Sequence, residues 1–419
     1  MDIVEILQSA WAMRALLAGS LVGITCGLLG CFIVLRNMSL IGDALSHSIL
    51  PGVVLAYVLV GQNLLGVFIG SLAAGIVTVV LMTWFQQNAK TKNDAVIGIV
   101  FTAMFSIGVM GISYLSHTPG FHLDLKDFLF GNILGIQDSD LQLTVLISVV
   151  VILGLVFLFR PLFITTFQPT IAFTQGIRVK SVHYALMILL SIVVVSALQT
   201  VGVILVVAML ITPASTALLL SDRLHRVLVL SGLIGLVSAV LGLLLSIYAQ
   251  TTPGPAMAVM ATLIYVLAVF FAPRKGLIKR WQRQRRQKLK VDLEDILKES
   301  FKLQEAGELG LKTLITKISI PAPRLKKLLG YLNRRNQIIL TPDLSLTPEG
   351  ISRAQALVRA HRLWETYLVN QIGLTEDQIH DEAEYQEHHS PDDLLDEIDA
   401  KLGYPSIDPH GSPIPPKKG

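Results

Sequence analysis

The segment "GDALSHSILPGVVLAYVLV", residues 42 to 60, places an aspartate and a histidine inside an apolar run that suits a lipid bilayer. Residues four apart share one face of an α-helix, so Asp43 and His47 point the same way. An ionisable side chain within a membrane span normally faces a cavity or pathway. A carboxylate with an imidazole also suits a divalent transition metal. The pair therefore predicts either a metal path or an ion pair, between the two or with Arg36, that fastens the helices.

The rest of the chain is equally apolar for its length. Of 419 residues, 52% are hydrophobic and 15% are charged, which excludes an ordinary soluble protein. Further apolar runs lie at about 12–35, 63–85, 95–115, 141–159, 184–198, 201–220, 227–248 and 255–272. A crossing needs roughly 20 residues, so we expect eight or nine transmembrane helices. Residues 184 to 220 form either a tight hairpin or one broken element.

Basic residues set the expected orientation, because cytoplasmic loops are rich in lysine and arginine. They cluster at alternate ends of the spans: at Arg36, 90–92, 160–180, 222–226 and from Arg274 onward. These ends are predicted to be cytoplasmic, the loop 116–132 to be outside, and the C-terminal third to be cytoplasmic.

The cytoplasmic segment 159–184 is long and has its own helical pattern. We expect a short amphipathic helix there, with Gln168, Ala172 and Gly176 on one side. Such a helix either docks on a partner protein or lies on the membrane surface without one.

Five successive segments carry a resemblance to a known family. They are "RNMSLIGDALSHSILPGVVLAY", "NDAVIGIVFTAMFSIGV", "DFLFGNILGI", "VGVILVVAMLITPASTALLLS" and "TPGPAMAVMATLIYVLAVFFAPRKG". Through them, residues 12 to 276 resemble the membrane subunit of bacterial zinc, manganese and iron ABC importers. The resemblance implies a place in the bacterial inner (plasma) membrane, with Asp43 and His47 on the metal path. It also implies that segment 159–184, with Gln168, Ala172 and Gly176, couples to an ATPase.

The same resemblance implies three protein partners: a cytoplasmic ATP-binding subunit, an extracytoplasmic metal-binding protein and a second permease subunit. The sequence holds no G-x-x-x-x-G-K-[ST] motif to cradle ATP phosphates. We therefore expect this chain not to be an enzyme, with hydrolysis supplied by the separate subunit. An ATP-independent channel or carrier is the rival interpretation.

The character of the sequence changes after residue 273. Nine lysines or arginines and no acid lie between Arg274 and Lys290, a pattern that favours contact with anionic lipid next to a membrane span. Residues 291 to 350 then show three helical segments followed by two short β segments, the plan of a winged helix-turn-helix. Its third helix offers phosphate contacts at Arg324, Lys326, Lys327, Arg334 and Arg335. A protein-contact module is the alternative.

The last part of the chain is rich in acids and histidines. Helical spacing of four aligns His361 with Glu365, His380 with Glu384, and Glu384 with His388, while Glu387 lies three residues past Glu384. The pattern predicts a metal cluster or, alternatively, a solvated acidic helix with incidental histidines.

A second resemblance follows from "HRLWE", "IHDEAEYQEHH" and "DPHGSPIP". Through these, residues 291 to about 415 resemble the diphtheria-toxin-repressor family of metal-dependent regulators. The resemblance implies metal ligands at Asp295, His361, Glu384, Glu387 and His388. The sequence departs at Lys298, where the manganese-responsive branch has a second carboxylate. An oxygen-rich set favours Mn²⁺ or Fe²⁺, with Zn²⁺ possible.

The predicted fold is an all-α polytopic membrane protein followed by a cytoplasmic winged helix and a helical metal-binding dimerisation domain. The expected boundaries are 1–273 for the permease, 274–290 for a basic linker, 291–350 for the winged helix and 351–419 for the last domain. The expected function is that of a permease for an ATP-driven importer of a divalent transition metal, fused to a metal-sensing, DNA-binding-like regulator. Two alternatives stay open: the attached tail gates transport without DNA, or the spans only anchor a membrane-tethered repressor.

Overall fold

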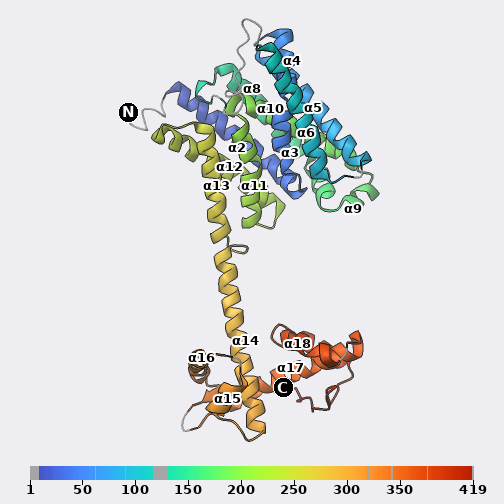
Figure 1. Ribbon diagram of the computed structural model, residues 1–419, viewed down its shortest axis with the longest axis vertical. Helices are drawn as coiled ribbons and strands as arrows, with labels where there is room; N and C mark the ends of the chain where they lie inside the picture. Colours follow the sequence, from blue (N-terminus) through green and yellow to red (C-terminus); the bar gives the residue numbers. More distant parts are fainter. Residues whose placement is uncertain are drawn as a thin grey trace. The chain divides into compact units, whose positions relative to one another are not determined.

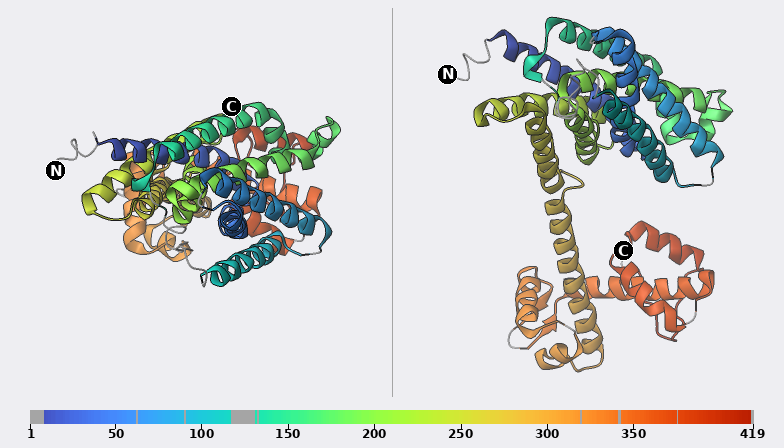
Figure 2. Two further views of the ribbon diagram at one scale, coloured as in Figure 1. Left: turned by 90° about the horizontal axis from the view of Figure 1, so that it is seen from above. Right: turned by 45° about the horizontal axis from the view of Figure 1, so that its top comes forward.

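A computed structural model describes residues 9–61, 63–89, 91–116, 131, 133–318, 320–340, 343–374 and 376–417. Most of the loop expected at 116–132 lies outside the described residues. The chain divides into two compact units, residues 1–280 and 281–419, and helices dominate both (Figures 1 and 2).

Long apolar helices build the first unit. Among the described residues, nine spans are long and apolar enough to cross a membrane. They are α2 (Ala10–Leu35), α3 (Leu40–Ser48) with α4 (Leu50–Val60), α5 (Leu64–Asn88), α6 (Asn93–Leu115), α8 (Asp138–Phe167), α10 (Val179–Val201), α11 (Val203–Leu220), α12 (Leu224–Ala249) and α13 (Pro253–Phe271). The prediction of eight or nine transmembrane helices is confirmed, and the described residues contain nine. Residues 184 to 220 fall into two helices separated at Gly202, whose φ of 81° suits glycine.

Small residues let the helices of this unit approach closely. Helix α2 packs against α8, α11 and α12. A Cβ atom at Gly235 of α12 would lie 2.1 Å from the carbonyl oxygen of Gly23 in α2. One turn away, Ser231 donates a hydrogen bond of 2.7 Å to the carbonyl of Gly27. Glycine and serine therefore bring the two backbones together, as is common between membrane helices.

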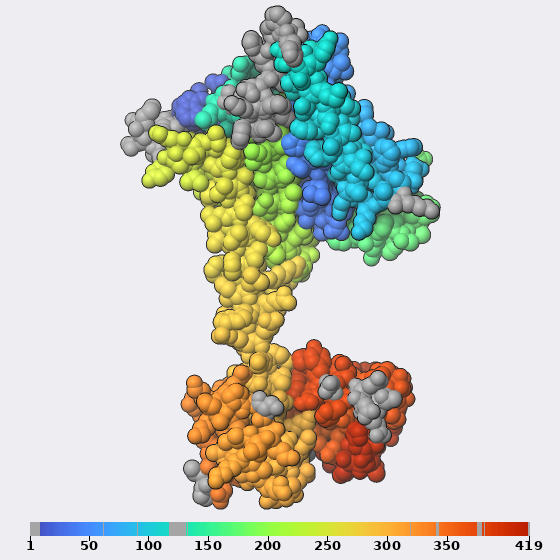
Figure 3. All heavy atoms as spheres, viewed as in Figure 1, coloured from blue at the N-terminus to red at the C-terminus, as the bar shows by residue number. Residues whose placement is uncertain are grey.

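The second span is bent. Helix α3 ends at Ser48 and α4 begins at Leu50, with Pro51 in its first turn. Proline lacks the amide hydrogen that a continuous helix needs. Pro51 therefore explains why the helix is interrupted at this point. Helix α4 packs on α5 and α6, which form one outer face of this unit in Figure 3. Asp43 and His47 lie on α3, just before the bend.

The second unit begins with one long helix. Helix α14 (Leu277–Glu305) is followed by α15 (Leu311–Lys317), α16 (Ala322–Arg334) and an antiparallel pair, β1 (Ile338–Ile339) and β2 (Ser345–Leu346). Three helices and two short strands thus occur in the predicted order. The basic segment expected as a linker is helical from Leu277 onward and forms the start of α14, because lysine, arginine, glutamine and leucine favour helix.

The remaining helices bring the acidic and histidine-rich segments together. They are α17 (Pro348–Tyr367), the π-helical turn η2 (Leu368–Ile372), α18 (Glu376–Glu387) and α19 (Asp392–Lys401). Helix α17 packs against both α18 and α19. A buried apolar cluster that includes Leu297 of α14 and Leu328 of α16 also includes Val358 of α17. Helices α14, α17 and α18 therefore hold their polar side chains at one place.

Candidate metal centres

The first candidate is the pair on α3. His47 Nε2 lies 3.6 Å from Asp43 Oδ1. The imidazole packs against Phe101 and Phe105 of α6, whose ring centroids lie 5.7 and 5.3 Å from the centroid of the His47 ring. Its Nδ1 is buried without a hydrogen-bond partner in the described part of the chain. The Asp43 side chain is 48% exposed, so the pair presents an accessible carboxylate beside the Nε2 of His47.

Arg36 has other partners. Its guanidinium donates hydrogen bonds of 2.8 Å to Thr165 Oγ1 and 3.1 Å to Thr166 Oγ1 of α8. It fastens α2 to α8, and no ion pair joins it to Asp43 among the described residues. Of the two ion pairs that the sequence allowed, only the one between Asp43 and His47 occurs among the described residues.

The expected coupling segment contains the short helix α9 (Pro169–Thr174). Gln168 caps its start, and Gly176 follows its end with a φ of 77°. Ala172 is fully buried, whereas Gln168 and Gly176 are exposed, so a shared coupling role for the three residues stays a prediction. The exposed apolar residues are Ile171 and Phe173, the latter 77% exposed. Helical spacing located the helix but could not tell which of its faces packs inward.

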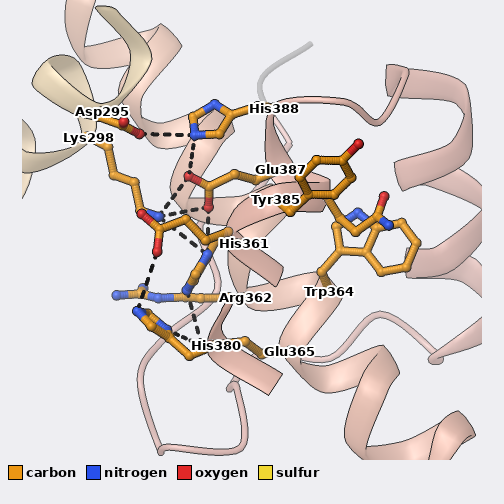
Figure 4. A network of polar contacts seen from close by, with 12 residues as sticks. Asp295, Lys298, His361, Arg362, Trp364, Glu365, His380, Tyr385, Glu387 and His388 are labelled. Atoms are coloured by element: carbon orange, nitrogen blue, oxygen red, sulfur yellow. Dashed lines mark hydrogen bonds and ion pairs between the residues drawn. The ribbon is translucent and has the colours of Figure 1, made fainter. Parts of the chain in front are cut away.

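In the second unit, His388 forms a group of potential metal ligands with Asp295 and Glu387 (Figure 4). Its Nε2 lies 3.0 Å from Asp295 Oδ1 and 3.4 Å from Glu387 Oε1. This nitrogen is buried and makes no well-aligned hydrogen bond within the described residues. Its Nδ1 lies 2.8 Å from Glu294 Oε2. A carboxylate that fixes one ring nitrogen while the other faces further carboxylates is the usual arrangement of a metal-binding histidine.

Glu294 is a functional residue that the sequence reasoning missed. Its side chain is buried and also accepts a hydrogen bond of 2.5 Å from Arg353. The available signal was helical spacing: Glu294 and Lys298 are four apart, and both face α17 and α18. Asp295, one residue on, was singled out by the resemblance instead.

A neighbouring group joins α17 to α18. His361 Nε2 lies 3.0 Å from Glu365 Oε1, and His380 Nδ1 lies 3.3 Å from the same oxygen. Potential ligand atoms of these three residues lie within 4.8 Å of one another. Glu384 stands at the rim, with Oε2 3.8 Å from His380 Nε2 and about half of its side chain exposed.

Lys298 contacts one member of each group. Its Nζ donates hydrogen bonds of 2.8 and 2.7 Å to the two oxygens of Glu387. The same nitrogen lies 3.3 Å from His361 Nδ1. The lysine is only 6% exposed, so an ammonium group occupies the interior of the cluster (Figure 4).

The charges of the cluster shift its pKa values in opposite directions. Burial alone would lower the pKa of His388, but the neighbouring carboxylates of Asp295 and Glu294 raise it to about 9. Burial would raise the pKa of Glu365, but hydrogen bonding from His361 lowers it to about 2. Oxygen and imidazole donors of this kind fit a divalent metal, which would displace a proton from His388 on binding.

The predicted phosphate-contact residues lie on one helix. Arg324, Lys326, Lys327, Arg334 and, just past its end, Arg335 are exposed around α16, whereas its leucines are buried. Arg324 forms an ion pair with Asp292 of α14. The guanidinium of Arg335 lies over the ring of Tyr331, 4.8 Å from its centroid. The structure therefore presents a basic helical face, part of which is engaged within the unit.

Comparison with known proteins divides the chain at a similar place. The ABC 3 transport family matches residues 8–272, and the iron dependent repressor, metal binding and dimerisation domain matches residues 347–416. The chain is similar to "Manganese transport system membrane protein MntC" of Halalkalibacterium halodurans, 43% identical over 284 residues, 68% of this chain and 95% of that protein. It is also similar to "Manganese import system permease protein ScaB" of Streptococcus parasanguinis, 41% identical over 64% of this chain and 93% of that one.

Solved structures resemble the two parts to different degrees. "PsaBC from Streptococcus pneumoniae in complex with Fab" has 36% sequence identity and a TM-score of 0.59, covering 66% of this chain and 97% of its own. A "Manganese-dependent transcriptional repressor complex with manganese" has 40% identity over 30% of this chain and 58% of its own. Its TM-score is 0.28.

Proposed function

The chain belongs to the ABC 3 transport family, and from this premise we propose that it imports a divalent transition metal, with Mn²⁺ favoured, as the permease subunit of an ATP-driven complex. The observation that carries the proposal is the Asp43–His47 pair, a polar ligand pair just before the bend of a membrane span. The similar permeases are named for the transport or import of manganese, which supports the same ion here.

The geometry of the pair suits passage of an ion. The carboxylate of Asp43 would attract the cation, and the imidazole of His47 presents its Nε2 on the same side, 3.6 Å from Asp43 Oδ1. Two protein ligands are few for a transition metal, so the remaining positions stay with water or a second chain. Weak, incomplete coordination favours release, which a pathway requires.

The partners follow from the same family. A cytoplasmic ATP-binding subunit would dock at α9, where Ile171 and Phe173 are exposed. A separate metal-binding protein would deliver the ion from outside, and a second permease subunit would complete the path. The basic start of α14 would contact anionic lipid headgroups on the cytoplasmic side.

We further propose that residues 281–419 form a cytoplasmic, metal-sensing and DNA-binding-like regulator. The match of residues 347–416 to a metal-binding and dimerisation domain supports this, as does the ligand group Asp295, Glu387 and His388. A bound ion would fix the geometry between Asp295 of α14 and His388, just past the end of α18. In a dimer, that fixed geometry would set the spacing of two winged helices whose α16 faces offer lysine and arginine to phosphates.

Transport is tested by metal uptake into cells that lack their own importer and express the complex with its ATPase. Asp43→Ala and His47→Ala are expected to reduce uptake about tenfold or more, since even a supporting partner of a metal ligand contributes that much. Asp94→Asn, an exposed acid in the first turn of α6, is the matched control and should leave uptake unchanged. Uptake that survives both pathway substitutions, or removal of the ATPase, would contradict the proposal.

Regulation is tested with the full chain in detergent, by a gel shift on DNA from the importer's own promoter with Mn²⁺ or with chelator. A shift that needs Mn²⁺ and weakens in Lys326→Ala with Lys327→Ala supports the regulator. If no shift occurs at any metal concentration while Mn²⁺ still changes uptake, the tail gates transport without DNA.

A further inference from the structure

The buried lysine in the metal-sensing cluster has no counterpart in an ordinary ligand set. Lys298 projects from α14, and its ammonium lies within hydrogen-bond distance of both oxygens of Glu387. Both side chains are almost completely removed from solvent, at 8% and 0% exposure. Burying an ammonium costs several kcal/mol unless a carboxylate in good geometry pairs with it. Lys298 is therefore a buried, paired member of the cluster and not a surface residue.

The position of the ammonium resembles that of a cation held by several ligands. It contacts a carboxylate from α18 and lies 3.3 Å from the Nδ1 of His361 on α17. Three helices thus converge on one positive charge. A metal ion and an ammonium require the same lone pairs, and Lys298 uses one lone pair on each oxygen of Glu387.

The two groups of potential ligands meet at this charge. One is Asp295, Glu387 and His388, and the other is His361, Glu365 and His380. Lys298 contacts Glu387 of the first and His361 of the second. These two residues also contact each other directly, with His361 Nδ1 2.6 Å from Glu387 Oε2. No room for a metal ion is left between them while the ammonium of Lys298 is in place. In the first group, His388 Nε2 and Asp295 Oδ1 lie 3.0 Å apart and do not contact the ammonium. These two atoms stay available to a metal ion.

We propose that Lys298 stands in for one metal ion, so that α14 stays docked on α17 and α18 without metal. The cluster then binds one ion fewer than it would with a carboxylate at position 298. This inference rests on the proposed metal-sensing function. Metal binds to a group that is already assembled, because the lysine supplies the link between helices that an ion would otherwise provide.

The test uses the full chain in detergent, with Mn²⁺ or with EDTA. Hydrogen exchange over residues 293–303 of α14 reports docking, and elemental analysis reports manganese per chain. Lys298→Met removes the ammonium, Lys298→Arg keeps the positive charge, and Lys298→Glu supplies a carboxylate. Lys302→Met is the matched control, since Lys302 is exposed one turn further along α14.

In the wild type and in the control, α14 should exchange at the same rate with and without metal. Lys298→Met should exchange at least tenfold faster in EDTA, and Lys298→Arg should behave as the wild type. Lys298→Glu should need Mn²⁺ for protection and hold one more ion per chain. Ions in the transport path contribute equally to all variants, so only differences are compared.

Two results would overturn the inference. One is a wild type whose α14 loses protection in EDTA as fully as Lys298→Met. The other is a Lys298→Glu variant that folds and holds the same number of ions as the wild type. Should Lys298→Met fail to fold, the comparison of Lys298→Arg with Lys298→Glu decides the question. His388→Ala tests the metal-sensing function by itself. If this substitution does not lower the amount of manganese per chain, in the wild type or in any Lys298 variant, the metal-sensing function is contradicted, whatever the hydrogen exchange of α14 shows.

Discussion

The two imidazoles of the candidate centres differ in how firmly they are held. His388 is fixed through Nδ1 by Glu294, and its Nε2 faces Asp295. His47 is positioned by aromatic rings, and the carboxylate of Asp43 is 3.6 Å away. A fixed ring and several oxygens suit a site that retains its ion. A loosely paired ring in a span suits a site that releases it.

The pH dependence of the metal-free regulator follows from His388. Its pKa of about 9 lies above the usual value of 6.5, so the folded state binds the proton more tightly than the unfolded state. The resulting stability is fully present below about pH 6.5 and is lost as pH rises toward 9, up to about 3 kcal/mol at about 1.4 kcal/mol per pH unit. Thermal unfolding of the second unit in EDTA should show this loss.

His388→Gln is the control for that titration, because glutamine keeps a hydrogen-bonding side chain but takes up no proton. Its stability should change less between pH 6.5 and 9 than that of the wild type. Equal slopes for the two proteins would show that other groups cause the dependence.

At the level of helices, backbone proximity and helix ends decide what each element can contact. The bend between α3 and α4 follows from Pro51, and the proximity of α2 and α12 follows from glycine. The short helix α9 exposes Phe173 while Ala172 is buried. Helices α2 and α12 therefore serve the packing of the bundle, whereas α9 presents an apolar side chain that a partner protein could contact.

Packing between α2 and α12 is tested by substituting single glycines. Alanine at Gly235 would place a Cβ 2.1 Å from a backbone oxygen, so Gly235→Ala should lower the free energy of unfolding by about 1–3 kcal/mol. Gly232→Ala, on the same helix, meets its nearest atom at 3.7 Å and should not lower stability, because alanine favours helix over glycine by about 1 kcal/mol. Melting in detergent measures both, and equal melting temperatures would contradict the close approach.

Docking at α9 is tested through Phe173. If it inserts into the ATP-binding subunit, Phe173→Ala should weaken the complex by about 2 kcal/mol, or roughly thirtyfold in Kd. Co-purification and metal uptake should both fall. Phe157 of α8 is 86% exposed within a membrane span, and Phe157→Ala should leave the complex intact. If the two variants bind the ATPase equally well, Phe173 is not an anchor.

For the whole molecule, the two units have separate apolar cores. The main core of the first unit holds residues from Ala15 to Ala261, and that of the second holds residues from Leu293 to Val358. Each unit also carries its own candidate metal ligands. Separate cores are the mark of parts that fold and act as domains, which agrees with the division of the family matches.

Removal of residues 281–419 is therefore expected to leave transport intact. Uptake at low manganese should stay within about twofold of the full chain, because no residue of the first core is lost. The response of the importer to high manganese should disappear. The full chain with His388→Ala should lose the same response, and a truncated protein that is still repressed by manganese would contradict a regulatory role for the tail.

The sequence alone determined the membrane spans and the change of character after residue 273, and it predicted most of the candidate metal ligands. These depend on local hydropathy and helical spacing, which neighbouring residues set. Only the tertiary structure decided that Ala172 is buried, that Glu294 orients His388, and that Lys298 meets Glu387 across 89 positions of sequence. Burial and ion pairing of this kind depend on which helices pack together, and spacing within one helix does not specify that.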